Sequence, residues 1–183
     1  MRIIDFCPDE KETIHQAAAL LVEGFADAWP DMEEALQEVW ESLEPGCISR
    51  VAVGEEGTVL GWIGGRPQYD GHVWELHPLI VRPEYRRQGI GRALIADLEE
   101  RVRGRGALTL WLGTDDTEDQ TTLSGVDLYP NPLDHLARIE NLHGHPFEFY
   151  LKLGFVIVGV MPDANGWGKP DIFMAKRVGF GSK

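Results

Sequence analysis

The stretch "RPEYRRQGIGRAL", residues 82–94, lies between a segment with strand character and a segment with helical apolar spacing. A helix that begins here leaves several backbone N–H groups unpaired and pointing at one spot, with the positive end of the helix dipole behind them. The glycines let an anion approach the backbone. Arg86, Arg87 and Arg92 can add charge-assisted hydrogen bonds. The stretch therefore predicts an anion site, and a diphosphate is the ligand that suits it best.

Two other diphosphate-binding motifs do not match. A P-loop needs Gly, four residues and then Gly-Lys-Ser or Gly-Lys-Thr, and the sequence contains no such run. A dinucleotide-binding fingerprint needs a third glycine at position 94, where the chain has Leu94. The alternative that stays open is an ordinary helix start whose glycines and arginines are only solvated.

Composition predicts one globular domain over residues 1–183. The 30 carboxylates against 17 Lys and Arg give a net charge of -13, which repels nucleic acid and anionic membranes and attracts cations. A polycationic small molecule or a basic peptide would suit this surface, although acidity can also serve solubility alone. Cys7 and Cys47 are expected to be free thiols. No apolar run could cross a bilayer and no leader pattern is found, so the expected location is the cytoplasm.

Apolar periodicity predicts alternating elements along the chain. Helices are expected at residues 9–25, 31–46, 89–106, 133–142 and 146–154. Strands are expected at residues 1–6, 72–81, 107–113, 155–161 and 171–178, together with a hairpin at 47–65. The polar, acidic stretch 114–132 is expected to be a long loop, and such loops are usually functional or disordered.

The run Arg86-Arg87-Gln88-Gly89-Ile90-Gly91 resembles the Arg/Gln-x-x-Gly-x-Gly/Ala motif of the GCN5-related N-acetyltransferases. The resemblance implies an α/β (α+β) fold with a mixed, mostly antiparallel central sheet of about seven strands and about four flanking helices. It implies an acetyl-CoA-dependent N-acetyltransferase. The residues that it assigns to acetyl-CoA are Leu79, Ile80, Val81, Arg86, Arg87, Gln88, Gly89, Ile90, Gly91 and Arg92.

A narrower resemblance, to the aminoglycoside 6'-N-acetyltransferases, covers most of the chain. It is based on the blocks "WELHPLIV", "LTLWLGTDD", "TTLS" with "DLYP", "HPFEFYLKLGFVIVGVMPDANG" and "GKPDIFMAK". It implies transfer of acetyl to the 6'-amine of these antibiotics, resistance to them, and a homodimer. The chain departs from the general acetyltransferase pattern at His145-Pro146, where many members begin the last helix with Asn.

The resemblance gives Glu75 and Tyr150 the catalytic roles. A carboxylate of pKa about 4.3 is a poor base for an ammonium of pKa roughly 8 to 10, so we expect Glu75 to orient the amine and pass its proton through water. Tyr150, with an ordinary pKa of about 10, is the expected proton donor to the departing thiolate. A backbone N–H near Leu79 is expected to polarise the thioester. The alternatives are an exposed strand glutamate and a core tyrosine.

The acceptor site is expected to be acidic with aromatic walls. The predicted contacts to the ammonium groups and sugar faces are Trp29, Tyr69, Glu75, His77, Asp115, Asp116, Glu118, Asp119 and Asp171. Solvated charges are the alternative for the acidic members. His143 and His145 lack a third ligand at a recognised spacing, so no metal site is expected. A different cationic amine, such as a polyamine or basic protein, or a non-catalytic acyl-CoA sensor, stays open as an alternative function.

Overall fold

The computed structural model describes residues 1–180; the last three residues of the predicted 1–183 domain lie outside the described part. The chain forms two compact units, residues 1–108 with 178–180, and residues 109–177. Together the described residues contain seven strands and five α-helices. That these units form one domain stays a prediction.

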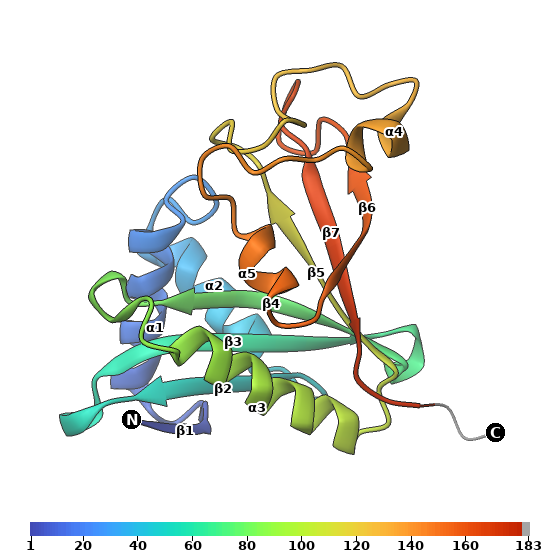
Figure 1. Cartoon of the computed structure of the whole chain (residues 1–183). Coiled ribbons are helices and arrows are strands. Elements are labelled where there is room, and N and C mark those ends of the chain that lie inside the picture. The colour runs from blue at the N-terminus through green and yellow to red at the C-terminus, as the bar shows by residue number, and fades with distance from the viewer. Residues whose placement is uncertain (181–183) are drawn as a thin grey trace. The chain divides into compact units, whose positions relative to one another are not determined.

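The first unit contains four antiparallel strands in the order β1-β2-β3-β4 (Figure 1). Their bounds are β1 Arg2–Asp5, β2 Ile48–Val53, β3 Val59–Gln68 and β4 Val73–Val81. The hairpin between β2 and β3 turns at Glu55–Gly57, where Glu56 and Gly57 take left-handed backbone angles. The strands predicted at residues 1–6, 47–65 and 72–81 are confirmed.

Helices α1 (Lys11–Gly24) and α2 (Met32–Ser42) pack on one face of these strands, and α3 (Ile90–Gly104) packs on the other (Figure 1). Helix α2 begins where predicted, because the Asp31 carboxylate accepts hydrogen bonds from the backbone N–H groups of Glu33 at 2.9 Å and Glu34 at 3.1 Å. The three long predicted helices are therefore confirmed, with ends that fall a few residues inside the predicted bounds.

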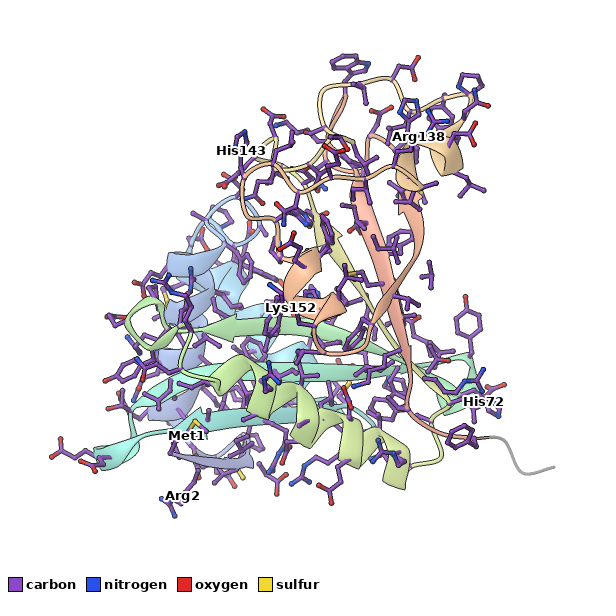
Figure 2. The ribbon with its side chains drawn as sticks, viewed as in Figure 1. Met1, Arg2, His72, Arg138, His143 and Lys152 are labelled. Atoms are coloured by element: carbon purple, nitrogen blue, oxygen red, sulfur yellow. The ribbon has the colours of Figure 1, made fainter. Side chains whose placement is uncertain are left out.

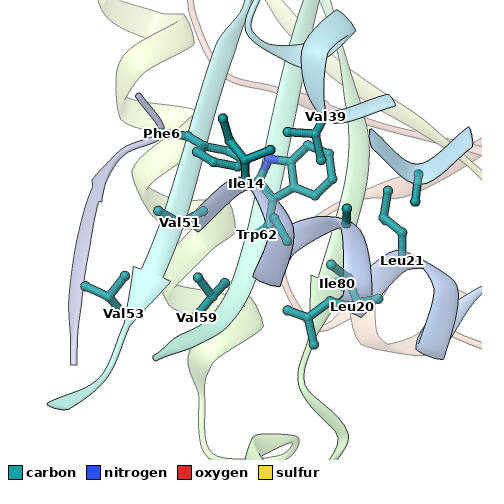
Figure 3. Packing of buried hydrophobic residues seen from close by; sticks show 13 residues of the cluster. Phe6, Ile14, Leu20, Leu21, Val39, Val51, Val53, Val59, Trp62 and Ile80 are labelled. Carbon is teal, nitrogen blue, oxygen red and sulfur yellow. The ribbon is translucent and has the colours of Figure 1, made fainter. Parts of the chain in front are cut away.

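The core of this unit lies between α1, α2 and the sheet (Figure 3). Trp62 of β3 is its largest member, is fully buried, and donates its indole N–H to the Ser49 hydroxyl at 2.8 Å. Full burial of a Val, Leu, Ile or Phe side chain stabilises a fold by about 1.5–3 kcal/mol relative to exposure. The other buried members are Phe6, Ile14, Ala17, Ala18, Leu20, Leu21, Ala35, Val39, Val51, Val53, Val59 and Ile80.

Strand β4 carries one extra residue opposite β3. Ile63 pairs with Leu79 and Gly65 pairs with Leu76, so three steps along β4 match two steps along β3. Such a bulge shifts the alternation of side chains. A Cβ on Gly64 would overlap the His77 carbonyl, so the bulge requires glycine there. Pro78 lies within this bulged segment, between Leu76 and Leu79.

The second unit contains β5 (Thr109–Asp115), β6 (Val156–Met161) and β7 (Asp171–Arg177), with β7 paired antiparallel to both of the others. Two five-residue helices accompany them, α4 (Pro132–Leu136) and α5 (Phe147–Leu151). The strands predicted in this region and the long loop after β5 are confirmed.

The helix predicted over residues 133–142 is wrong beyond Leu136. The following segment pairs with the loop instead: Thr122 N–H donates to the Glu140 carbonyl at 3.1 Å, and Glu140 N–H donates to the Thr122 hydroxyl at 3.0 Å. These local hydrogen bonds replace those that a helix would supply. Among residues 1–180, no helix is both long and apolar enough to cross a membrane.

Candidate active site

The turn before α3 presents backbone donors. Gly89 is the N-cap residue with φ 86°, a left-handed conformation that favours glycine, and Arg87 is also left-handed at φ 60°. The first hydrogen bond of the helix runs from Ala93 N–H to the Gly89 carbonyl at 3.0 Å. The N–H groups of residues 90–92 precede any intrahelical partner, and no hydrogen bond described within residues 1–180 uses them. Several unpaired N–H groups at one helix start can together bind the oxygens of a diphosphate.

The side chains of this turn are arranged around its carbonyl groups. Arg86 donates its Nε–H to the Val81 carbonyl at 3.1 Å, and Gln88 donates to the Glu84 carbonyl at 3.2 Å. Arg87 and Arg92 are exposed. The buried side chain of Ile90 anchors the start of the helix, which fixes the direction of the free N–H groups. Coenzyme binding by these residues stays a prediction.

The predicted coenzyme residues at the end of β4 differ in accessibility. Ile80 belongs to the core under α1 and α2, whereas Leu79 and Val81 are half-buried. The core packing of the Ile80 side chain leaves its main chain as the part that a ligand can contact.

Glu75 and His77 lie on the face of β4 toward α2, and both are half-buried. Glu75 accepts a hydrogen bond from the Gln68 amide at 2.8 Å. The His77 Nε2 atom lies 3.6 Å from Glu38 Oε1, and the His77 ring lies 5.8 Å from the Trp29 ring, centroid to centroid. The structure thus brings the predicted Glu75, His77 and Trp29 into one region of the first unit.

Sequence reasoning missed Glu38 and Arg66, which complete this region. Glu38 is buried in α2 and accepts a hydrogen bond from Arg66 at 2.5 Å, while Glu41 lies 3.7 Å from the same guanidinium nitrogen. The sequence does contain a signal for Glu38, because this charged residue falls on the apolar stripe of α2 together with Ala35 and Val39. A charged residue on such a stripe usually has a specific partner.

Tyr69, the second predicted aromatic contact, is 75% exposed in the turn between β3 and β4, with φ 48°. No hydrogen bond described within residues 1–180 uses its side-chain hydroxyl. Its accessible ring leaves the prediction of a sugar contact open.

Tyr150 lies on α5 in the second unit and is buried. Its ring contacts those of Phe149 and Phe155 edge to face, with centroids 5.1 and 5.7 Å away. Burial raises the pKa of the Tyr150 phenol above its ordinary value of 10.0, because the phenolate would lose its hydration. The phenol is therefore protonated at neutral pH, as a proton donor must be.

The predicted acidic contacts of the second unit already hold local partners. Asp116 is fully buried and accepts backbone hydrogen bonds from Gln120 at 2.7 Å and Thr121 at 2.8 Å, so it organises the loop after β5. Asp115 accepts a hydrogen bond from the Asn165 amide at 2.5 Å. Their part in substrate binding stays a prediction, with Asp115 the more accessible of the two.

Three more acidic residues differ in setting. Asp119 accepts hydrogen bonds from Ser124 at 2.7 Å and Lys169 at 3.0 Å, and these contacts lower the pKa of its carboxyl group. Glu118 is exposed on the same loop, and Asp171 is half-buried at the start of β7 beside Gly113.

His145 is buried at the start of α5. Its Nε2–H donates to the Asp115 carbonyl at 3.1 Å, and its Nδ1 accepts from Phe147 N–H at 3.2 Å, an arrangement that needs the neutral ring. Burial lowers the pKa of His145, although the Asp115 carbonyl and the charges of Asp116 and Asp115 act in the opposite direction. His143, by contrast, is exposed in the preceding loop (Figure 2).

The acetyltransferase (GNAT) family matches residues 14–124, which include the turn before α3 and the strand that carries Glu75. The chain belongs to this family. Over its full length it is similar to a crystal structure of an aminoglycoside 6'-N-acetyltransferase complexed with coenzyme A, with 43% identity, complete coverage of both chains and a TM-score of 0.93. It is also similar to a crystal structure of an aminoglycoside 6'-N-acetyltransferase from Enterococcus faecium, with 43% identity, complete coverage of both chains and a TM-score of 0.91. The predicted fold class is thereby confirmed.

Two curated relatives add shorter matches. An aminoglycoside N(6')-acetyltransferase type 1 from Klebsiella aerogenes is 34% identical over 109 residues, 52% of this chain and 71% of the relative. An amino-acid acetyltransferase from Pseudomonas syringae pv. syringae is 30% identical over 131 residues, 70% of this chain. The match covers only 30% of the length of that relative.

Proposed function

We propose that this protein is an aminoglycoside 6'-N-acetyltransferase, which moves an acetyl group from acetyl-CoA to the 6'-amine of an aminoglycoside antibiotic. The observation that carries the proposal is the full-length similarity, at 43% identity and a TM-score of 0.93, to an enzyme of that activity. The composition supports it, because a net charge of -13 attracts a polycationic acceptor.

Acetyl-CoA would supply the activated acyl group as a thioester. In this proposal, the N–H groups of residues 90–92 hold its diphosphate, with Arg86, Arg87, Gln88 and Gly89 around them. The helix dipole and the absence of a side chain at Gly89 and Gly91 favour an anion here. The main chain at residues 79–81 is the proposed contact for the rest of the coenzyme arm, and an N–H near Leu79 the proposed donor to the thioester oxygen.

Glu75 is the proposed partner of the acceptor amine. Its carboxylate is half-buried and held by the Gln68 amide, so its direction is fixed. An ordinary carboxylate is too weak a base to deprotonate an ammonium directly. Glu75 therefore orients the amine and passes its proton to water, with His77 and Trp29 forming the wall beside it.

Tyr150 is the proposed general acid. It carries its proton at neutral pH for the reason given above, and a positioned acid of this kind contributes typically about 10²–10⁴-fold to a rate. Asp115, Asp116, Glu118, Asp119, Asp171 and Tyr69 are the proposed outer contacts to the remaining ammonium groups and sugar faces. Asp115, Glu118 and Tyr69 are the most exposed members without a cationic partner among the described residues.

Several broader expectations also belong to the proposal. Resistance to aminoglycosides follows from the activity, and a cytoplasmic location fits an enzyme that uses acetyl-CoA. A homodimer is supported by β6, which pairs only with β7 among the strands of the second unit and exposes Val156, Val158 and Met161. Exposed apolar edges of this kind favour pairing with another chain.

Thiol release from acetyl-CoA tests the proposed function. We expect release when kanamycin is added and only background release with an analogue whose 6' position carries a hydroxyl, because the acceptor must be an amine. Spermidine is the comparison for a different cationic amine, and a faster rate on spermidine would overturn the assignment of the acceptor. Background release with every amine would leave a non-catalytic acyl-CoA sensor as the remaining function.

A further inference from the structure

The pairing of β3 with β4 places Arg66 directly opposite Glu75. Residues opposite each other in an antiparallel pair have Cβ atoms about 4.5–5.5 Å apart on the same face, so an Arg and a Glu in these positions are expected to form an ion pair. The structure has a different arrangement. Within residues 1–180 the salt bridges of Arg66 run to Glu38 at 2.5 Å and Glu41 at 3.7 Å, and none runs to Glu75.

Glu38 is the group that draws the guanidinium away. It projects from the buried stripe of α2, where an apolar residue would pack at less cost, because a carboxylate loses its hydration on burial. The same Glu38 Oε1 atom accepts from Arg66 Nη2 and lies 3.6 Å from His77 Nε2. Glu75 meanwhile receives only a neutral donor, the Gln68 amide at 2.8 Å, among its described hydrogen bonds.

We propose that Glu38 is a positioning residue of the acceptor site: it holds the Arg66 guanidinium away from Glu75, so that the Glu75 carboxylate is available to pair with the ammonium group of the acceptor. This inference rests on the proposed function, since it concerns the amine that Glu75 would contact. Without Glu38, the guanidinium turns to the carboxylate opposite it and competes there with the substrate cation.

The activity test compares Glu38→Gln with the double variant Glu38→Gln/Arg66→Gln. The single variant frees the guanidinium, so we expect the KM for kanamycin to rise about tenfold, equivalent to about 1.4 kcal/mol of binding free energy. The double variant removes the competing cation, so its KM is expected to return to within about twofold of the parent. Coenzyme A affinity, measured by titration calorimetry, is expected to stay constant in both.

A matched control is Glu34→Gln, which removes one charge from an exposed position on the same helix. Its KM is expected to match that of the parent. If the double variant is as impaired as Glu38→Gln, Glu38 acts through helix packing and the proposal is wrong. A parental KM for the single variant would also contradict it.

A crystal structure of Glu38→Gln tests the same inference without any activity. We expect the Arg66 guanidinium within 4 Å of the Glu75 carboxylate, the limit for a salt bridge. A guanidinium that keeps its position beside α2 overturns the proposal. If the parent protein fails to acetylate kanamycin, the proposed function fails, while this structure still decides whether Glu38 controls Arg66.

Discussion

Burial changes the acid–base properties of individual side chains in this protein. The Tyr150 phenol is the clearest case, because its ring lies among Phe149 and Phe155 and its pKa rises as a result. A raised pKa makes the phenol a weaker acid but keeps it protonated at neutral pH, as its proposed role of proton donor requires. In the proposed reaction, proton transfer to a coenzyme thiolate, with a pKa of about 8.5 as for cysteine, is uphill, and the raised pKa of Tyr150 adds to that cost.

Replacing Tyr150 with Phe removes the hydroxyl and keeps the aromatic packing. We expect kcat with kanamycin to fall by about 10²-fold, the lower range for a general acid. Coenzyme A affinity is expected to stay within about twofold, as measured by calorimetry, because Phe keeps the aromatic packing and the backbone donors before α3 are unchanged. A variant with parental kcat would show that the proton reaches the thiolate by another route, and that Tyr150 is only a core residue.

At the scale of elements, the short helix α5 depends on a neutral histidine. His145 bridges the Asp115 carbonyl at the end of β5 and the Phe147 N–H at the start of α5. Protonation would place a hydrogen on Nδ1 against the Phe147 N–H. Because its folded pKa lies below the ordinary 6.5, the unfolded chain binds a proton first as the pH falls. His145 therefore contributes stability above pH 6.5, and this contribution decreases as the pH falls through the folded pKa.

Chemical denaturation between pH 5 and 7.5 tests whether the free energy of unfolding decreases as the pH falls. The slope of unfolding free energy against pH from one such histidine is at most about 1.4 kcal/mol per pH unit. We expect His145→Gln to unfold more easily at pH 7.5 and to have a smaller slope than the parent. His143→Gln, at an exposed position two residues away, is the control and should keep the parental slope. Equal slopes for the parent and His145→Gln would refute the role of His145.

Elements with local signals were the part of the fold that the sequence could predict. Asp31 ahead of an amphipathic run predicted the start of α2, and the glycines of the 82–94 stretch predicted the donors before α3. The 133–142 prediction failed because Thr122 and Asn141 supply side-chain hydrogen bonds that periodicity cannot reveal. The same limit applies to the candidate site: Glu38 and Arg66 are 28 residues apart, and only the packing of α2 on β3 brings them together.

At the scale of the whole molecule, the net charge of -13 has a measurable consequence for the proposed acceptor. Salt shortens the reach of this charge from about 10 Å at 0.1 M to about 3 Å at 1 M. We expect the KM for kanamycin to rise several-fold over this range. A glycoside with a single 6'-amine is the control, because with one ammonium group its KM should change much less. Equal salt dependence for both acceptors would show that the outer carboxylates contribute nothing to binding.

The extra residue in β4 lies between the segment that carries Glu75 and the segment that carries the core residue Ile80. Before it, Glu75 and His77 face the helices α1 and α2; after it, Ile80 faces the same way, although plain alternation would point it to the opposite side. The strand thus changes phase between His77 and Ile80. The gain or loss of one residue in this segment would move either the Glu75 carboxylate or the Ile80 side chain to the face of the sheet that α3 covers. The length of this segment therefore decides which side chains β4 presents to α1 and α2.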